Sequence, residues 1–516
     1  MKYASDIQIV WLKRDLRLRD HAPLSEAIRA KLPTLIVYWL EPSLVQSAES
    51  DVRHWRFVYE SLQAMRAQLS QHCIPLYILH AEVLPTLQYL LKEVRIVRLL
   101  SYQETGLKIT FDRDRAVRHF CQRMGIIWQE FAQDGIRRGA SNRNDWQTQL
   151  EQYLNAAPHS VNFADLQPFI LSEPSEQQLR GPALPAAITE TCKDFQPGGE
   201  HAAWRYLQSF FAERATNYNR HLSKPLYSRR SCSRLSPYIA WGNLSVREIY
   251  QWTLLHQNNK ALAAPMRNFQ SRLWWRSHYI QKLESLWRLE FEPINPGLKA
   301  LNRRIDERFE AWAQGRTGFP MVDASMRCLI ATGWVNFRMR AMLATFATFT
   351  LWQDWRAAAQ HLARLFLDYE PGIHFAQFQM QAGLTGYHTM RIFNPIVQAQ
   401  RHDTDGAFVR QWLPELQQVP IPQLYTPWAM TNMEQAFYNC RIGVDYPAPI
   451  VDYDEATRHA KARYWSIRQS PEVQAYLPAI WERLCLPTDI DKYKNQTLPT
   501  APDATNALPT PDIIGQ

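Results

Sequence analysis

The chain has 516 residues, of which 46% are hydrophobic and 21% are charged, a composition close to that of ordinary soluble globular proteins. This length accommodates two or three domains with large cores. The formal net charge of +9 is compatible with a phosphate-rich partner but does not require one. No apolar run approaches the roughly 18 residues that a membrane span requires, so we expect a cytoplasmic protein without membrane segments.

Aromatic residues make up 12% of the chain and include 19 Trp. This content suits either flat ligands and electron transfer or a large helical core filled with indoles, and composition alone leaves both open. The seven cysteines are scattered, without a Cys-x-x-Cys pair. That spacing argues against a disulfide framework, a zinc site and an iron–sulfur cluster, so we expect no metal.

Short apolar runs alternate with helical patterns through the first third of the chain. The runs suit buried parallel strands and are Ile7–Leu12, Thr34–Leu40, Leu76–His80, Arg95–Leu100 and Ile126–Phe131. The alternation predicts a doubly wound α/β domain over residues 1–160. Because no Gly-x-Gly-x-x-Gly loop follows the first strand, this domain either binds a small molecule in another way or serves as a scaffold.

The remaining chain divides by composition. Residues 161–200 are rich in Pro, Ser, Gln and Glu, which predicts an interdomain connector. Helical periodicity then predicts a large all-α domain over residues 201–480. Residues 481–516, whose end is rich in Pro, Thr and Ala, are predicted to form a loose tail.

The segment from Ser231 to Tyr238 concentrates groups that can bind an anion. Ser236 followed by Pro237 fits the N-cap and first turn of a helix. A helix N-terminus attracts anions, and Ser233 and Arg234 add a hydroxyl and a guanidinium beside it. The segment is therefore either a phosphate site or an ordinary capped helix.

A second segment places two arginines in an apolar context. Asn336 and Arg340 lie four residues apart and share one helix face. Arg338 and Arg340 cannot both be buried without partners, and Asp368 is a candidate partner. The alternative is that both arginines lie on the surface with their aliphatic stems against the protein.

Further motifs follow one another along the chain. They are Val10–Arg17, Ser233–Tyr238, Trp275-Arg276, Gly315–Pro320 with Asp323-Ala324, Thr332–Trp334, Arg338–Arg340, Arg391–Pro395 and Arg410–Glu415. In this order and spacing the chain resembles the photolyase/cryptochrome flavoprotein family over roughly residues 6–475. The resemblance implies an antenna-type α/β domain and a helical domain that holds U-shaped FAD. It also makes an antenna chromophore possible, without identifying it.

The resemblance carries functional roles to individual positions. It implies FAD contacts at Tyr218, Cys232, Ser233, Arg234, Leu235, Ser236, Phe269, Arg272, Trp334, Phe337, Arg340, Asp368, Tyr369, Glu370 and His374. It implies DNA contacts at Arg220, Arg272, Trp275, Arg276, Arg338 and Met380, and catalytic roles for His374, Trp355, Trp275 and Arg272. Arg340 and Asp368 correspond to the family's ion pair beside the flavin.

The lesion pocket departs from the family pattern. Arg272 stands where family photolyases have a glutamate, Phe337 where they have Asn or His, and Met380 where they have Trp. Losing polar partners for a damaged base should cost about 1–3 kcal/mol each. We expect Arg272 to stack on a base or pair with a phosphate; the alternative is a salt bridge to Glu284 or another acid.

The family's flavin N5 and electron-relay positions also differ. His374 falls at the position that faces N5, where an imidazole would titrate near neutrality, unless Gly372 shifts the register and turns it elsewhere. Of the three relay tryptophans only the middle one, Trp355, is present. Phe378 and Asn302 occupy the other two positions, which should slow hopping along this route.

These features support a leading hypothesis and two alternatives. The leading one is a light-driven lyase in which FAD repairs a pyrimidine dimer flipped out of DNA by a monomeric protein. The altered pocket favours a cryptochrome-type blue-light receptor without repair activity. A flavoprotein acting on single-stranded nucleic acid or RNA is the third.

Overall fold

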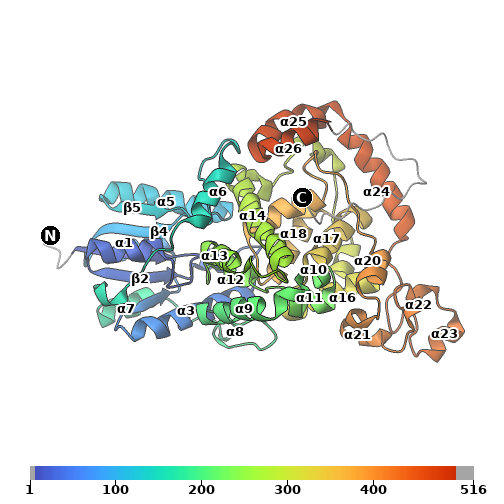
Figure 1. Ribbon diagram of the computed structural model, residues 1–516, viewed down its shortest axis with the longest axis horizontal. Coiled ribbons are helices and arrows are strands. Elements are labelled where there is room, and N and C mark those ends of the chain that lie inside the picture. The colour runs from blue at the N-terminus through green and yellow to red at the C-terminus, as the bar shows by residue number, and fades with distance from the viewer. Residues whose placement is uncertain (1–5, 496–516) are drawn as a thin grey trace.

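The structure is a computed structural model that describes residues 6–495. A parallel sheet with the strand order β3-β2-β1-β4-β5 lies at the N-terminal end of the molecule (Figure 1). Its strands are β1 (Asp6–Leu12), β2 (Thr34–Trp39), β3 (Leu76–Leu79), β4 (Arg95–Tyr102) and β5 (Ile127–Phe131). All five predicted strands are confirmed, and their ends shift by only one or two residues.

Both faces of this sheet are buried, which explains why its strands are apolar throughout. Ile9 and Trp11 of β1 point into one core, whereas Val10 and Leu12 point into another. The helices of this domain are α1 (Ala22–Ala30), α2 (Pro42–Val45), α3 (Val52–Ser70), α4 (Val83–Leu90), α5 (Lys108–Met124) and α6 (Trp146–Asn155). The doubly wound α/β domain that we predicted is therefore confirmed.

The predicted connector contains short helices that pack on the α/β domain. They are η1 (Phe163–Asp165), α7 (Glu173–Arg180) and α8 (Ala186–Thr189). Pro168 forms a bridge to Thr34 at the start of β2, and Leu179 is buried in the core that contains Ile9. The segment is therefore ordered against the sheet domain.

A helical domain follows and fills the centre and right of Figure 1. Its first helices are α9 (Glu200–Ala212), η2 (Arg214–Asn217), α10 (Tyr218–His221), α11 (Pro225–Ser231), α12 (Ser236–Ala240), α13 (Val246–His256), α14 (Ala263–Ser285), η3 (Trp287–Glu290), η4 (Pro296–Leu301) and α15 (Arg308–Ala313). The central helices are α16 (Pro320–Thr332), α17 (Phe337–Thr345), the π-helix η5 (Phe346–Thr350), α18 (Trp355–Leu365) and α19 (Pro371–Gln381).

The chain ends in a projecting lobe and a helical arm. The lobe contains α20 (Pro395–His402), α21 (Ala407–Trp412), η6 (Pro414–Leu416), α22 (Ile421–Leu424), η7 (Pro427–Ala429) and α23 (Asn432–Phe437). The arm contains α24 (Tyr453–Arg468), α25 (Pro471–Leu484) and α26 (Pro487–Asn495), drawn in red in Figure 1. The predicted loose tail is thus wrong for residues 481–495, because α25 continues to Leu484 and Leu484 and Cys485 are buried. Residues 496–516 lie outside the described part.

The two domains share one hydrophobic core, which joins α3 and α6 to α9, α12, α13 and α14. Their backbones also approach closely at Gly242. A Cβ there would lie 2.2 Å from the carbonyl oxygen of Arg14, and the residue has a φ of +73°. Only glycine meets both demands, so this position fixes how the helical domain sits on the end of β1. Among residues 6–495, no helix is long and apolar enough to cross a membrane.

Candidate functional site

The loop before α12 is held in an unusual conformation. Arg214 donates to the carbonyl oxygens of Cys232 and, at 3.2 Å, Ser233. Arg234 has a φ of +59°, a left-handed conformation that costs a non-glycine residue roughly 1–2 kcal/mol. Two donors of its guanidinium contact Gln196 Oε1 at 2.6 and 3.0 Å. Such strain is typical of binding sites and persists because surrounding contacts hold it.

Arg234 lies in a surrounding that is rich in positive charge. It is buried, and its guanidinium lies 4.1 Å from the centre of the Trp334 ring. Burial and the neighbouring Arg229 lower its pKa to about 10. Because Arg234 and Arg229 repel each other, an anionic group such as a diphosphate would be bound favourably between their donors.

The structure corrects the role that we predicted for Ser236 as a helix cap. Ser236 is the first residue of α12, the N-cap is Leu235, and the cap makes no side-chain hydrogen bond. The helix has only 5 residues, so its dipole is weak. Leu235 is fully buried, which leaves its side chain no surface for a ligand. The anion-binding character of this loop therefore comes from its arginines.

Arg340 and Asp368 form the ion pair that the sequence predicts. Arg340 Nη1 and Nη2 contact the two carboxylate oxygens of Asp368 at 3.0 and 2.8 Å, a bidentate geometry. Asn336 caps α17 by accepting a hydrogen bond from Met339, which fixes the helix that carries Arg340. The alternative of an unpaired surface arginine is wrong for Arg340, whose side chain is 24% exposed and pairs with an Asp368 side chain that is 4% exposed.

His374 lies inside an aromatic cage on α19. Its ring is 5.4 Å from Tyr369 and 5.9 Å from both Phe366 and Phe378. His374 Nε2 lies 2.8 Å from the carbonyl oxygen of Ala359. A carbonyl only accepts, so Nε2 carries the proton and Nδ1 is left as an acceptor.

Burial lowers the pKa of His374 to about 4. The expectation that this imidazole titrates near neutrality is therefore wrong, because the charged form would lose its hydration inside the aromatic cage. Below a pH of about 6.5 the unfolded chain takes up a proton that folded His374 refuses. His374 thus lowers stability as the pH falls from about 6.5 toward 4.

We expect the variant His374→Asn to lose less stability in acid than the wild type. Asparagine keeps an amide donor for Ala359 but does not titrate. Between about pH 7.5 and about pH 5 the wild type should lose about 2 kcal/mol more unfolding free energy than the variant. Guanidinium unfolding at both pH values measures this difference, and carboxylates common to both proteins cancel. Equal losses would contradict the assignment.

Two exposed aromatic side chains lie among the residues predicted to contact a lesion. Trp275 is 44% exposed and Phe337 is 52% exposed. Trp275 stacks on Tyr279 at 5.7 Å, and the hydroxyl of Tyr279 lies 4.0 Å from Met380 Sδ. Large apolar side chains at the surface of a protein commonly mark binding sites.

Arg272 is also exposed and lies one turn before Trp275 on α14. It bonds to the Tyr218 side chain. Glu284, the acid proposed as an alternative partner, instead pairs with Arg138 at 3.3 Å. A salt bridge between Arg272 and Glu284, which was the alternative, is therefore wrong.

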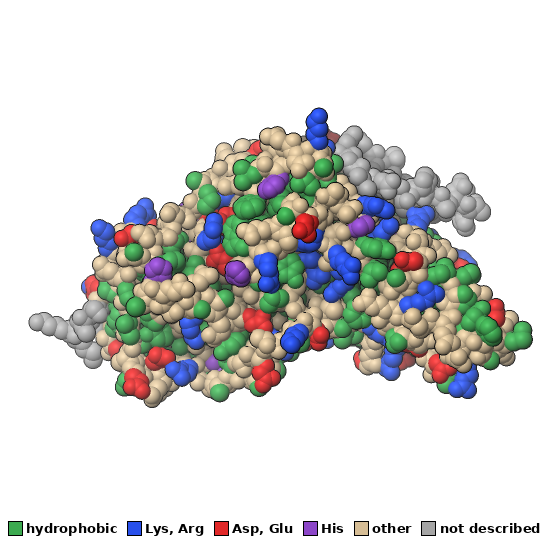
Figure 2. All heavy atoms as spheres, turned by 60° about the horizontal axis from the view of Figure 1, so that its bottom comes forward, with side chains coloured by type: hydrophobic (Ala, Val, Ile, Leu, Met, Phe, Trp, Pro, Cys, Tyr) green, Lys and Arg blue, Asp and Glu red, His purple; other side chains and the backbone are tan. Residues whose placement is uncertain are grey.

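Basic residues surround this part of the surface. Burial and the nearby cations Arg338, Arg401 and Lys224 lower the pKa of His402 to about 4. Burial together with Arg220 and Lys224 also lowers the pKa of His221. Figure 2 shows Lys and Arg side chains gathering near the middle of one face. A positive field of this kind attracts nucleic-acid phosphates.

Arg276, which we predicted to contact DNA, is buried between the two domains. Its guanidinium contacts Asp134 at 2.6 Å and Glu370 at 3.4 Å. Arg14 lies 3.7 Å from the same Glu370 carboxylate. The prediction for Arg276 is therefore corrected: it and Glu370 form an interdomain ion cluster, and neither is open to a phosphate.

Phe269, Trp355 and Tyr369 are buried in the helical domain. Phe269 packs between Phe210 and Tyr218, with ring centroids 5.1 and 6.1 Å away. Trp355 begins α18 and is buried, whereas Asn302 is exposed in a left-handed conformation. The buried hydroxyl of Tyr369 has no hydrogen-bond partner among the described residues.

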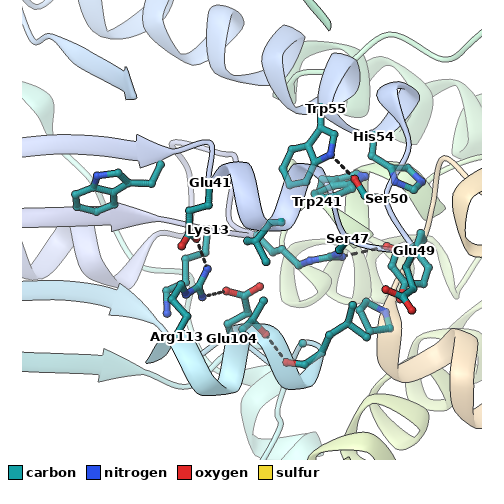
Figure 3. Close-up of a pocket in the computed structure, with 18 of the residues that line it drawn as sticks. Lys13, Glu41, Ser47, Glu49, Ser50, His54, Trp55, Glu104, Arg113 and Trp241 are labelled. Atoms are coloured by element: carbon teal, nitrogen blue, oxygen red, sulfur yellow. Dashed lines mark hydrogen bonds and ion pairs between the residues drawn. The ribbon is translucent and has the colours of Figure 1, made fainter. Parts of the chain in front are cut away.

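A pocket that the sequence analysis did not predict lies between the two domains (Figure 3). It opens at the carboxyl ends of β1 and β2 and beside the segment after β4. In open α/β sheets, ligands bind at this edge, where the strand order reverses. Its lining includes Trp11, Lys13, Arg14, Tyr38, Trp39, Glu41, Ser47, Glu49, His54, Trp55, Glu104, Arg113, Trp241 and Tyr369.

Polar groups at one end of the pocket form an ion cluster. Arg113 contacts Glu41 at 2.6 Å and also pairs with Glu104, as Figure 3 shows. Burial nevertheless raises the pKa of Glu41 to about 7. The indole N–H of Trp39 is buried without a hydrogen-bond partner among the described residues. Indole walls and an unpaired donor suit a flat aromatic ligand with polar edges.

Comparisons with known proteins agree with both domains. A family model described as DNA photolyase matches residues 8–149, and one described as FAD binding domain of DNA photolyase matches residues 269–466. A deoxyribodipyrimidine photo-lyase of Alkalihalophilus pseudofirmus is 29% identical over 89% of this chain and 98% of its own. A cryptochrome DASH of Gloeobacter violaceus is 28% identical over 88% of this chain and 95% of its own.

Solved structures show the same architecture. A cryptochrome of Synechocystis has a TM-score of 0.78 and 25% identity, covering 90% of this chain and 100% of its own. An archaeal photolyase of Sulfolobus tokodaii, described with two FAD molecules, has a TM-score of 0.74 and 22% identity, covering 89% of this chain and 100% of its own. The molecule is thus an FAD-binding flavoprotein with an α/β domain. The chain belongs to the photolyase/cryptochrome family.

Proposed function

We propose that this protein is a light-driven DNA lyase that repairs a pyrimidine dimer, acting as a cytoplasmic monomer. The observation that carries the proposal is the exposure of the aromatic side chains Trp275 and Phe337, with exposed Arg272 one turn before Trp275 and further basic residues around His402. Stacking on such aromatics contributes about 1–3 kcal/mol per base. Extruding the damaged bases costs a few kcal/mol, less where damage has already weakened stacking.

The donor set of the helical domain suits FAD. The strained Arg234 loop and Arg229 would hold the diphosphate, and the neutral His374 and the Arg340–Asp368 pair would lie beside the ring system. When bound, FAD supplies an electron on excitation by blue light. His374 would offer Nδ1 as a hydrogen-bond acceptor, and the Arg340–Asp368 pair would hold a fixed charge arrangement next to the ring.

The side chains at the surface would position the DNA. Trp275 and Phe337 would stack on the extruded bases, and Met380 would line the pocket through its contact with Tyr279. Arg220, Arg272 and Arg338 would bind phosphates, which makes affinity fall with salt. Arg276 would act indirectly, because its ion pairs with Asp134 and Glu370 fix α14 against the α/β domain.

We also propose that the interdomain pocket holds a second, antenna chromophore. Support comes from its place at the carboxyl ends of the strands, its indole walls and the unpaired donor of Trp39. The Sulfolobus tokodaii photolyase, which shares the fold, is described with two FAD molecules. The indole walls of the pocket suit a flat conjugated ligand and do not select one pigment.

A blue-light receptor without repair activity is the second candidate. The observation that favours it is the identity of Arg272, Phe337 and Met380 in place of the polar and stacking groups of family photolyases. A receptor would need no pocket matched to a damaged base. The relatives include both photolyases and cryptochromes, so similarity does not choose between the two functions.

Repair of defined lesions separates the two functions. Chemically reduced holoprotein is illuminated with oligonucleotides that carry one cyclobutane dimer or one pyrimidine–pyrimidone (6-4) product, with a dark control. We expect light-dependent restoration of one lesion by the wild type and at least about tenfold less by Trp275→Ala, which loses a stacking wall. Failure of fully reduced protein to repair either lesion would leave the receptor as the better account.

A further inference from the structure

A group of cationic side chains is buried where α14 meets the C-terminal arm. The two cations are Arg143, which precedes α6, and Lys282 on α14. The aromatic side chains of His278, Tyr387 and His388 surround them. Tyr493 of α26 covers the group, with its ring 4.9 Å from that of Tyr387. None of these residues lines the interdomain pocket, and the ring of His278 lies 5.4 Å from that of the exposed Trp275.

Arg143 is the most deeply buried member, at 2% exposure. Its Nη2 donates to the carbonyl oxygen of His278 at 3.4 Å. Its Nε and Nη1 are buried and have no hydrogen-bond partner among the described residues. Leaving donors of a buried charged group unpaired costs more than the roughly 1–3 kcal/mol typical of a neutral group.

Lys282 brings a second positive charge to the same place at 4% exposure. Its Nζ contacts the Tyr387 hydroxyl at 3.3 Å and lies 5.3 Å from the centre of the Tyr279 ring. Burial lowers the pKa of Lys282 to about 8, with Arg143 contributing in the same direction. At neutral pH most of this lysine is still charged, beside a guanidinium of the same sign.

The surrounding groups supply little negative charge. Burial keeps His278 and His388 neutral by lowering the pKa of each well below 6.5, and it raises the pKa of the Cys485 thiol. The carboxylate of Asp489 on α26 interacts electrostatically with Lys282. Its side chain is 29% exposed, however, and pairs with Lys492 at 3.6 Å. Within residues 6–495 the two buried cations thus have no buried carboxylate to balance them, which is strongly unfavourable.

We propose that a small inorganic anion, phosphate or chloride, binds between Arg143 and Lys282 and holds the C-terminal arm on α14. The free Nε and Nη1 donors of Arg143 and the remaining donors of Lys282 Nζ provide its ligands. Such a site is distinct from both chromophore sites. Because α14 also carries Arg272 and Trp275, the anion would stabilise the helix that presents them.

The test measures the melting temperature of the FAD-loaded protein at constant ionic strength, with sodium gluconate replaced stepwise by sodium phosphate or, separately, by sodium chloride. The variants are Lys282→Met and Arg143→Met, and Arg115→Met is the control because its side chain is 67% exposed. Wild type and control should gain about 3–5 °C at saturation with the bound anion. Both cluster variants should gain at least threefold less. Anions that bind at the DNA surface raise all four proteins alike and therefore cancel.

A second readout covers the case in which Arg143→Met does not fold. In gluconate, Lys282→Met should melt no lower than the wild type, because the substitution removes a repulsive buried charge. Wild-type crystals soaked in bromide should show an anomalous peak between Arg143 Nε and Lys282 Nζ. Equal anion responses in the wild type and Lys282→Met, or no bromide at this place, would overturn the proposal.

Discussion

The variant Arg340→Met is expected to lose FAD about 30- to 150-fold more readily than the wild type. The substitution leaves the Asp368 carboxylate, which is 4% exposed, without the bidentate partner that now lies 2.8–3.0 Å away. An uncompensated buried charge costs about 3–5 kcal/mol, and we expect about 2–3 kcal/mol of this to appear in cofactor affinity. Arg340 also covers the ring of Phe366 at 4.1 Å, so the side chain that shapes the aromatic cage is lost as well.

The ratio of bound FAD to protein after gel filtration, and FAD fluorescence on dilution, measure the loss. Arg364→Met is the matched control, because Arg364 is exposed and its Nη1 donates to the Ala48 carbonyl at 3.4 Å. The double variant Arg340→Met/Asp368→Leu removes the buried charge and should recover thermal stability, because apolar pairs replace buried ion pairs well. If it also recovers FAD at wild-type affinity, the pair has a structural role only.

The variant Ser47→Trp is expected to abolish binding of the second chromophore while FAD stays bound. Ser47 lies in the pocket lining, which also includes the indoles of Trp55 and Trp241 (Figure 3). An added indole occupies the volume that a flat ligand needs, and overpacking of a preformed site costs about 1–3 kcal/mol even before ligand atoms are displaced. Light absorption by the purified protein should therefore lose the bands that FAD does not explain.

Denaturation followed by chromatography of the released pigments provides the measurement. We expect FAD and a second pigment from the wild type, and FAD alone from Ser47→Trp. Ala48→Trp is the control, since residue 48 is exposed on the same turn and does not line the pocket. Equal amounts of both pigments from the two variants would show that the second ligand binds elsewhere.

Local patterns predicted the elements that depend on neighbours in the chain. Apolar runs bounded by helical periodicity identified the five strands, because burial on both faces requires continuous apolar residues. The Arg340–Asp368 pair could be inferred because a charge in an apolar helix needs a partner. The predicted loose tail was wrong for residues 481–495, because the composition of the chain end was extended over α25 and over α26, which begins at Pro487. Proline is tolerated at the first position of a helix.

The individual site residues could be predicted less well. We predicted that Arg276 contacts DNA and that Glu370 contacts FAD. Instead, Arg276 forms ion pairs with Glu370 and with Asp134, which is far away in the sequence. No sequence motif indicated the pocket at the ends of β1 and β2. Its lining residues come from separate strands and, in the other domain, from Trp241 and Tyr369. A search of strand ends for clustered charges and indoles would have indicated it.

The sequence by itself determined the two-domain architecture, the family and the residue types offered to FAD and DNA, since these depend on periodicity and on motifs read within short windows. Tertiary structure alone decided which charges are available. Burial made His374 neutral, placed Arg276 in an interdomain ion cluster, and left two buried donors of Arg143 near Lys282 without a hydrogen-bond partner among residues 6–495. The physical reason is that desolvation and Coulomb energy depend on the distances and burial of side chains, which only the folded chain brings together.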